Sequence, residues 1–256
     1  SNSTCRAVKI QMLCGGSGNP FASAPNSYKQ RAAGLALAVL GTATGAAAFT
    51  YLTPPVNSPV TLADVTGIVS PTGTAAISTA GYELYLYNNA GLATTLASGI
   101  ADSSGLRSTT LYSIGGEELT LSGTIDVSRF EVLNSAGVVL SGGNRLVGTD
   151  TTLIVNSRLT FGGDETVHEL SGTGEIAGAP VSTLTVGEGA FYGNISGGDS
   201  FTLDKVSGGN LYLYGANTFT GLTTIHGGEL GLTTGGSLAS KFVSVGAGSV
   251  LSLYST

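Results

Sequence analysis

The sequence contains no tryptophan, one methionine and two cysteines among its 256 residues, and aromatic residues make up only 7%. Charged residues are also scarce, at 10% where soluble domains carry about 25%. The chain is nevertheless not a disordered polar tract, because hydrophobic residues reach 41% and the mean hydropathy is +0.29. Its 40 glycines follow no three-residue period and there are only seven prolines, which excludes collagen. These properties predict many short strands separated by turns of small residues.

Basic residues are few and scattered along the chain. Ten Lys and Arg stand against sixteen Asp and Glu, which gives a net charge of −6. Because nucleic-acid binding requires a basic stripe, we do not expect a nucleic-acid partner. Cys5 and Cys14 are the only thiols, and a zinc site needs about four ligands. We expect a disulfide between them or two idle thiols, and no metal or cofactor.

Residues 1–55 are predicted to be an N-terminal extension with a signal-like apolar segment. A basic cluster, Lys29-Gln30-Arg31, precedes an uncharged run from Ala32 to Ala48, as in a secretory signal. The alternative is a short helix of small residues at the start of a fragment, because 28 residues precede the cluster. A third reading, membrane insertion through the Gly41–Gly45 spacing, is disfavoured because the run is shorter than the ~20 residues of a bilayer span.

Three prolines at positions 54, 55 and 59 mark a linker, since proline removes a backbone donor. Beyond it, residues 56–114 are predicted to form a β-rich N-terminal cap or a small β region. The clearest strand is Gly81–Tyr87, in which polar and apolar residues alternate with a period of two.

Residues 115–256 show an internal repeat of about 20 residues. Apolar residues two positions apart recur at steps of 19 or 21, with one gap that Phe191 partly fills. These pairs, the candidate core stack, are Leu119 and Leu121, Val138 and Leu140, Leu159 and Phe161, Leu211 and Leu213, Leu230 and Leu232, and Leu251 and Leu253. Such a period is typical of a solenoid of stacked parallel strands, with glycine and asparagine at its corners. We therefore predict an all-β parallel β-helix of about seven turns, with these side chains in a single continuous column. Because the sequence ends in a strand without a cap, we expect this β-helix to be truncated at its C-terminal end.

The segment from Leu211 to Leu230 reads LYLYGANTFTGLTTIHGGEL and resembles the autotransporter-associated β-strand repeat. The matching positions are Gly215, Ala216, Asn217, Thr218, Gly221, Thr224 and Ile225. Phe219 stands where the repeat usually has tyrosine, and Leu222 replaces a glycine. The resemblance covers roughly residues 165–253 and is weak before residue 115.

This resemblance implies the passenger region of a Gram-negative autotransporter, a product of type V secretion. Such passengers form right-handed parallel β-helices and are exported by a C-terminal outer-membrane barrel, which this sequence does not include. The implied location is the cell surface of the outer membrane or the medium, and the implied partners are a host receptor, another protein or a second copy.

Candidate catalytic and metal-binding groups each have a plainer explanation. Gly198-Asp199-Ser200 is faintly similar to a serine-hydrolase motif, with His168 or His226 as the base, but the same residues suit a corner. We favour the corner and predict no catalytic residues. A group of acidic residues, Asp164, Glu165, Glu169 and Glu175, could suggest calcium, but a solvated face explains it better. Similarly, Tyr82, Tyr85 and Tyr87 could stack on a sugar or simply pack across strands.

Two functions from different classes follow. The first is a non-enzymatic, cell-surface or secreted β-helical rod that acts as an adhesin or scaffold in virulence, through host-cell binding, aggregation or immune modulation. The second is the stalk of a secreted toxin or hydrolase whose active domain lies outside this sequence. A third reading, an ice- or polysaccharide-binding β-helix, would need a regular threonine array, for which Thr223-Thr224 and Thr233-Thr234 are too few.

Overall fold

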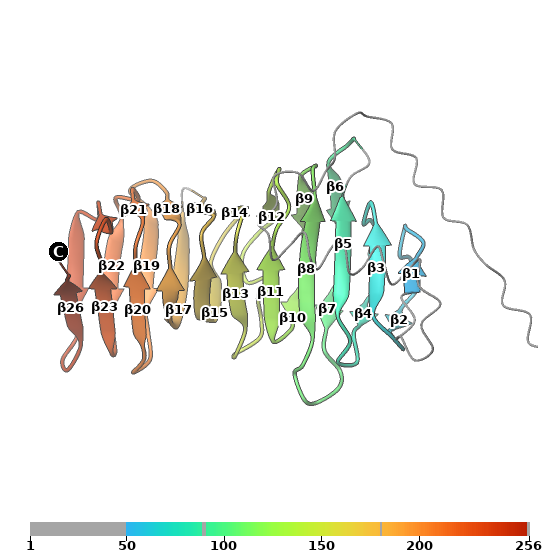
Figure 1. Ribbon diagram of the computed structural model, residues 1–256, viewed down its shortest axis with the longest axis horizontal. Helices are drawn as coiled ribbons and strands as arrows, with labels where there is room; N and C mark the ends of the chain where they lie inside the picture. The colour runs from blue at the N-terminus through green and yellow to red at the C-terminus, as the bar shows by residue number, and fades with distance from the viewer. Residues whose placement is uncertain (1–49, 89–90, 180, 255–256) are drawn as a thin grey trace, which may run out of the picture. The chain divides into compact units, whose positions relative to one another are not determined.

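The computed structural model describes residues 50–88, 91–179 and 181–254, which contain 26 strands and no helix. Every strand pairing in this part of the chain is parallel. The strands stack into a β-solenoid, whose longest sheet runs through eleven strands in succession (Figure 1). The parallel β-helix predicted from the repeat is therefore confirmed. Cys5, Cys14 and the signal-like run from Ala32 to Ala48 lie outside the described residues.

The first side of the solenoid, face A, faces the viewer in Figure 1. Its strands are β1 (Thr50–Leu52), β3 (Thr66–Val69), β5 (Leu84–Asn88), β8 (Thr110–Gly115), β11 (Arg129–Val132), β13 (Thr152–Val155), the second halves of β15 (Glu165–Gly172) and β17 (Ser182–Phe191), β20 (Asn210–Leu213), β23 (Glu229–Leu232) and β26 (Val250–Leu253). Seven of these strands follow residue 116, in agreement with the seven turns expected from the repeat.

Two further faces complete each turn. Face B contains β6 (Thr94–Leu96), β9 (Leu119–Leu121), β12 (Val138–Leu140), β14 (Arg158–Phe161), β16 (Glu175–Gly178) and β18 (Asn194–Ser196), followed by β21 (Ala216–Asn217) and β24 (Ser237–Leu238). Face C contains β2 (Val60–Thr61), β4 (Ile77–Ser78), β7 (Ile100–Ala101) and β10 (Ile125–Asp126), followed by the first halves of β15 and β17, β19 (Phe201–Lys205), β22 (Leu222–Ile225) and β25 (Phe242–Val245). Strands from residues 56–114 and from residues 115–254 pair within the same sheets.

The long strands β15 and β17 bend from face C to face A. The start of β17 pairs with β19 from Ser182 to Val186, whereas its end pairs with β20 from Gly189 onward. A carbon added at Gly189 would lie 2.0 Å from a backbone oxygen of the preceding turn, and its φ is +138°. Only glycine fits such a close corner. The apolar repeat is therefore interrupted at this position.

The predicted leucine column divides into two columns on different faces. On face B, Leu119 pairs with Val138, and Val138 with Leu159. On face A, by contrast, Leu211 pairs with Leu230. Both columns repeat at about 20 residues because one full turn separates neighbours on either face. The gap in the repeat lies where the recognisable pairs pass from one face to the other.

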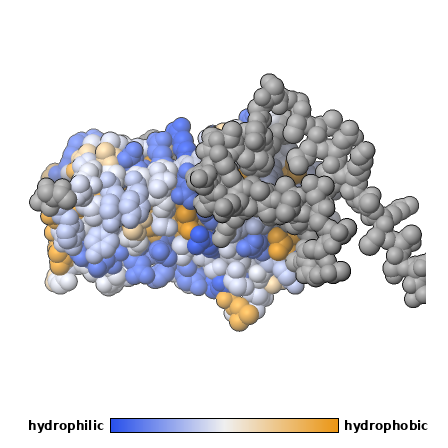
Figure 2. Space-filling model, in the orientation of Figure 1, coloured by the Kyte–Doolittle hydropathy of each residue, from blue (hydrophilic) through white to orange (hydrophobic). Residues whose placement is uncertain are grey.

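Burial of the predicted core follows the position along the solenoid. All of the residues predicted for the stack as far as Leu230 are buried. Leu232 and Leu251 are partly buried, and Leu253 is 73% exposed. Phe242, on β25, is also 73% exposed, and apolar side chains gather at this end of the solenoid in Figure 2. The last described turn thus has core-type side chains on its open side.

Candidate functional site

The residues proposed from a serine-hydrolase motif do not converge. Ser200 lies on an exposed corner that closes through a hydrogen bond from the Phe201 N–H to the Gly198 carbonyl oxygen, at 3.2 Å. His226 follows the far end of the neighbouring strand, because Lys205 at the end of β19 pairs with Ile225. No hydrogen bond joins Ser200 to a histidine within the described residues. The geometry therefore agrees with the corner that the sequence favoured.

Both histidines instead pair with acidic residues at the edge between faces C and A. The Nε2 atom of His226 lies 3.0 Å from Asp204 Oδ1, and that of His168 lies 3.6 Å from Glu188 Oε1. Each pair joins neighbouring turns, and the histidine side chains remain about half exposed. Such exposed pairs contribute at most ~1 kcal/mol to stability.

The four clustered acidic residues serve different faces. Asp164 Oδ1 accepts the backbone N–H of Thr183 at 2.7 Å, Glu169 accepts the Thr152 hydroxyl on face A, and Glu175 accepts the Ser196 hydroxyl on face B. No group of three or more His, Cys, Asp or Glu that could hold a metal occurs in the described ranges.

Glu165 departs from the expected solvated face, because it is 1% exposed. Its carboxylate accepts the backbone N–H groups of Arg145 at 3.0 Å and Leu146 at 2.8 Å. Leu146 also forms an isolated parallel bridge with Ile125 of β10. The turn that contains Leu146 has no full strand on face C, and there the Glu165 carboxylate accepts the N–H groups that a neighbouring strand would otherwise pair with. Burial raises the pKa of Glu165, and the two backbone hydrogen bonds oppose this rise. In the sequence, its inward direction was visible only as the alternation of Glu165, Val167 and their neighbours.

Asn217 is the polar centre of the repeat motif and is 1% exposed. Its Oδ1 atom accepts the backbone N–H of Ile195 at 3.0 Å, and its Nδ2 atom donates to the carbonyl oxygens of Gly215 and Ser237, both at 2.9 Å. One side chain therefore links three successive turns at the end of β21, where the strands are shortest. Backbone groups that would otherwise stay unpaired are satisfied in this way.

The other motif residues also have structural roles. A carbon added at Gly215 would lie 2.0 Å from the Gly193 carbonyl oxygen, and one added at Gly221 would lie 1.9 Å from that of Phe201. The N–H of Ala216 donates to Asn194 Oδ1 at 2.9 Å, and that of Thr218 donates to the Ile195 carbonyl oxygen at 2.8 Å. On β22, Ile225 is buried and Thr224 lies on the outer side of face C. The motif thus encodes contacts between turns.

Lys205 is a buried group that the sequence reading did not single out, although it alternates inward with Phe201 and Leu203. Its Nζ atom donates to the carbonyl oxygens of Val206 at 2.7 Å, Ser207 at 3.1 Å and Gly227 at 2.9 Å. Burial lowers the pKa of Lys205, while the nearby Glu188 raises it. The ammonium group stabilises the corner between faces C and A, because it donates to three carbonyl oxygens in place of backbone N–H groups.

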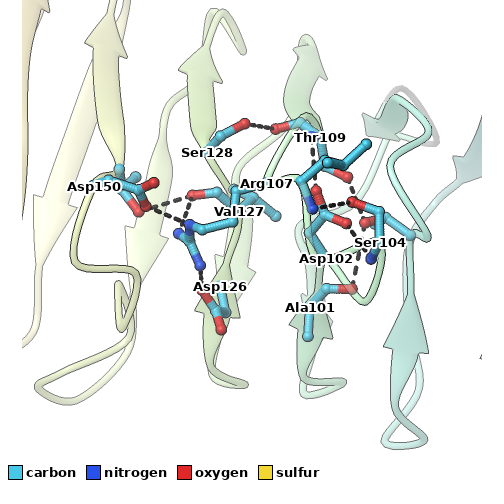
Figure 3. A network of polar contacts seen from close by, with 12 residues as sticks. Ala101, Asp102, Ser104, Arg107, Thr109, Asp126, Val127, Ser128 and Asp150 are labelled. Atoms are coloured by element: carbon cyan, nitrogen blue, oxygen red, sulfur yellow. Dashed lines mark hydrogen bonds and ion pairs between the residues drawn. The ribbon is translucent and has the colours of Figure 1, made fainter.

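A second polar network fixes the loop between β7 and β8 (Figure 3). Asp102 accepts the backbone N–H groups of Ser104 at 2.8 Å and Thr109 at 3.0 Å. Arg107 forms ion pairs with Asp126 and Asp150 from the two following turns. These contacts tie the loop to the two turns that follow it.

The predicted tyrosine strand lies on face A. Tyr85 and Tyr87 are on its outer side, and the Tyr85 ring stacks on Tyr112 of the next turn with centroids 4.5 Å apart. Burial raises the pKa of both Tyr85 and Tyr87. Cross-strand packing therefore accounts for Tyr85, whereas Tyr82 is 39% exposed and lies before the strand.

Hollows on the described surface are open and shallow. The first, of about 390 Å³, lies at the C-terminal end of the solenoid. It is lined by Leu232, Thr233, Thr234, Gly235, Gly236, Leu253 and Tyr254. Its lining carries the hydroxyl groups of Thr233, Thr234 and Tyr254, and no histidine, cysteine, lysine or carboxylate among the residues that form it. Across residues 50–88, 91–179 and 181–254, no helix is long and apolar enough to span a membrane.

Comparison with protein-family models, with curated proteins and with solved structures found no match to this chain.

Proposed function

We propose that the chain is part of an autotransporter passenger, exported to the bacterial surface or released, and that it acts there as a non-catalytic adhesin or scaffold. The proposal rests on the resemblance of residues 211–230 to the passenger repeat, together with the fold. The carrying observation is that Asn217, the polar centre of this motif, hydrogen-bonds to the turns before and after it. A motif of this kind belongs to a stacked rod, and a rod can hold a binding surface away from a cell.

The mode of assembly also fits export as an extended chain. Each turn pairs with its immediate neighbours, so turns can be added one at a time as the chain emerges. The described core contains no disulfide and packs through aliphatic and phenylalanine side chains. The chain's own partner under this proposal is a host receptor, another surface protein or a second copy, and its carrier is a C-terminal outer-membrane barrel.

Display on cells tests this proposal. The chain would be placed between a secretion signal and an autotransporter barrel in a Gram-negative host, and its exposure measured by protease cleavage on intact cells. We expect cleavage at the surface, and more attachment to cultured epithelial cells or faster settling than cells with the barrel alone. The matched variant Leu230→Asp, which disrupts the stack, should lose both properties.

Two results would overturn the proposal. One is retention of the chain in the periplasm when an established passenger in the same fusion reaches the surface. The other is full display without any gain in attachment or settling over the barrel alone.

A further inference from the structure

Four tyrosines gather on the outer side of the C-terminal turns of face A. Tyr192, Tyr212, Tyr214 and Tyr254, here called the tyrosine patch, lie on or directly after β17, β20 and β26, which neighbour one another through β23 in Figure 1. The rings of Tyr192 and Tyr214 stack with centroids 4.1 Å apart, and those of Tyr212 and Tyr254 meet edge to face at 6.1 Å. Tyr192 is 55% exposed and Tyr254 is 48% exposed.

Hydrogen bonds hold part of this patch in a fixed arrangement. Asn210 Nδ2 donates to the Tyr212 hydroxyl at 3.0 Å, and the Tyr212 hydroxyl donates to Glu229 Oε2 at 3.4 Å. The Tyr254 hydroxyl donates to the other oxygen of the same carboxylate. Hydrogen bonds from Ser252 and Tyr254 lower the pKa of Glu229, which favours its ionised form. Rings and polar groups are thus positioned before any ligand arrives, which reduces the entropy lost on binding.

The patch has no space for a second side chain between its rings. Gly231 pairs with Tyr212 of the preceding turn and with Ser252 of the following turn, on the outer side of face A. A carbon added at Gly231 would be 2.5 Å from the Tyr212 ring and 3.0 Å from the Tyr254 ring. The two rings therefore lie over bare backbone, and the polar groups are at their rims.

The charge around the patch selects against anionic ligands. The outward positions of face A from β15 onward include Glu169, Glu188 and Glu229, and none of them in the described strands is lysine or arginine. A flat, exposed surface also offers no deep pocket for a small apolar molecule. Aromatic rings with amide, carboxylate and hydroxyl groups at their rims suit a ligand with apolar C–H faces and many hydroxyls.

We infer that the tyrosine patch is a binding site for an uncharged glycan chain. Sugar rings contact the exposed tyrosine rings, while their hydroxyls donate to Glu229 and exchange hydrogen bonds with Asn210. The parallel turns repeat at about 4.8 Å, so the patch extends along the solenoid and takes more than one sugar unit. The inference names a ligand class for the proposed adhesin role, and it is tested on the purified chain without cells.

The test uses tyrosine fluorescence, which is readable because the sequence has no tryptophan. Cellohexaose, maltohexaose and N-acetylchitohexaose are titrated into the whole chain, with heparin as an anionic comparison, and calorimetry measures the dissociation constants. We expect at least one hexasaccharide to bind, and heparin not to bind. Tyr192→Ala and Tyr254→Ala should weaken binding at least tenfold. The matched control Tyr82→Ala removes an exposed tyrosine outside the patch and should change affinity less than twofold.

Two further variants of Tyr192 distinguish a binding site from a stack of tyrosines that only stabilises the fold. Tyr192→Leu keeps an apolar side chain in the corner and removes the flat ring, so it should stay folded by circular dichroism and lose binding. Tyr192→Phe should retain most of the affinity. Absence of binding to all three hexasaccharides, or equal losses in Tyr82→Ala and the patch variants, would overturn the site. Either failure leaves the display experiment on cells unaffected, so the two proposals stand or fall separately.

Discussion

The side chain of Asn217 takes the place of a strand partner for Ile195, whose backbone N–H it accepts at 3.0 Å across 22 residues. On its other side it donates to the Ser237 carbonyl oxygen in the next turn. This contact shows how face B continues where β21 and β24 are only two residues long. A buried amide completes the hydrogen bonding that short strands cannot supply.

Removal of this amide should therefore destabilise the C-terminal turns. Asn217→Ala leaves the buried N–H of Ile195 and the carbonyl of Ser237 without their partner, at a cost of about 1–3 kcal/mol for each group. We expect a loss of about 2–4 kcal/mol in the free energy of unfolding, measured by urea titration with circular dichroism. The control Asn57→Ala changes an exposed asparagine and should stay within about 0.5 kcal/mol. Equal stability of Asn217→Ala and the parent chain would contradict the assigned role.

Two glycines with different surroundings provide a second comparison. In Gly215→Ala, the new methyl group would lie 2.0 Å from the Gly193 carbonyl oxygen, so the turns must separate. We expect a loss of about 1–3 kcal/mol, as for other overpacking changes. Gly198→Ala places its methyl group in open space, with nothing within 4 Å, and should be neutral or slightly stabilising. Thermal unfolding of both variants checks this, and similar melting temperatures for the two would refute the close approach.

The repeat period was sufficient to predict the fold but not the faces. Apolar pairs about 20 residues apart imply stacked turns, and the register confirms stacking at this step for both Leu119–Val138 and Leu211–Leu230. The spacing cannot distinguish columns, however, because residues one turn apart stack on any face. The bend at Gly189 within β17 determines where face C becomes face A. The apolar pattern of the sequence does not mark this bend.

Polar groups in the core were the least predictable part. Glu165 and Lys205 follow the inward alternation of their strands, but their residue types indicate solvent exposure. Each is buried because unpaired backbone groups of neighbouring turns surround it. The partners of Glu165, and Gly227 among those of Lys205, are about 20 residues away, so local sequence does not reveal them. The tyrosine patch likewise combines rings from three turns.

The same substitution, leucine to aspartate, can test where the buried part of the predicted leucine stack ends. Leu230 is fully buried between Leu211 and Leu251, whereas Leu253 is 73% exposed. Leu230→Asp places an unpaired charge in the core and should cost several kcal/mol, enough to unfold neighbouring turns. Leu253→Asp should change the unfolding free energy by less than about 0.5 kcal/mol. Calorimetry of both variants decides, and similar losses would mean that Leu253 is covered in solution.

Acid stability should depend on Asp102. Partial burial acts to raise the pKa of Asp102, but hydrogen bonds from Ser104 and Thr109 outweigh it and lower the pKa from 3.8 to about 2. The unfolded chain therefore binds a proton at higher pH than the folded chain does. The stabilisation from this carboxylate is present above about pH 4 and is lost as the pH falls toward about 2.

Asp102→Asn removes this ionisable group and keeps one oxygen to accept a backbone N–H. Its free energy of unfolding should be lower than that of the parent chain at pH 7, and the two should approach each other as the pH falls from about 4 to about 2. Urea titrations at pH 7, 4, 3 and 2, values chosen at roughly unit steps around the two pKa values, measure this difference. The control Glu118→Gln changes an exposed carboxylate and should run parallel to the parent. A difference that stays constant over the range would show that Asp102 fixes the loop through hydrogen bonds that do not depend on its charge.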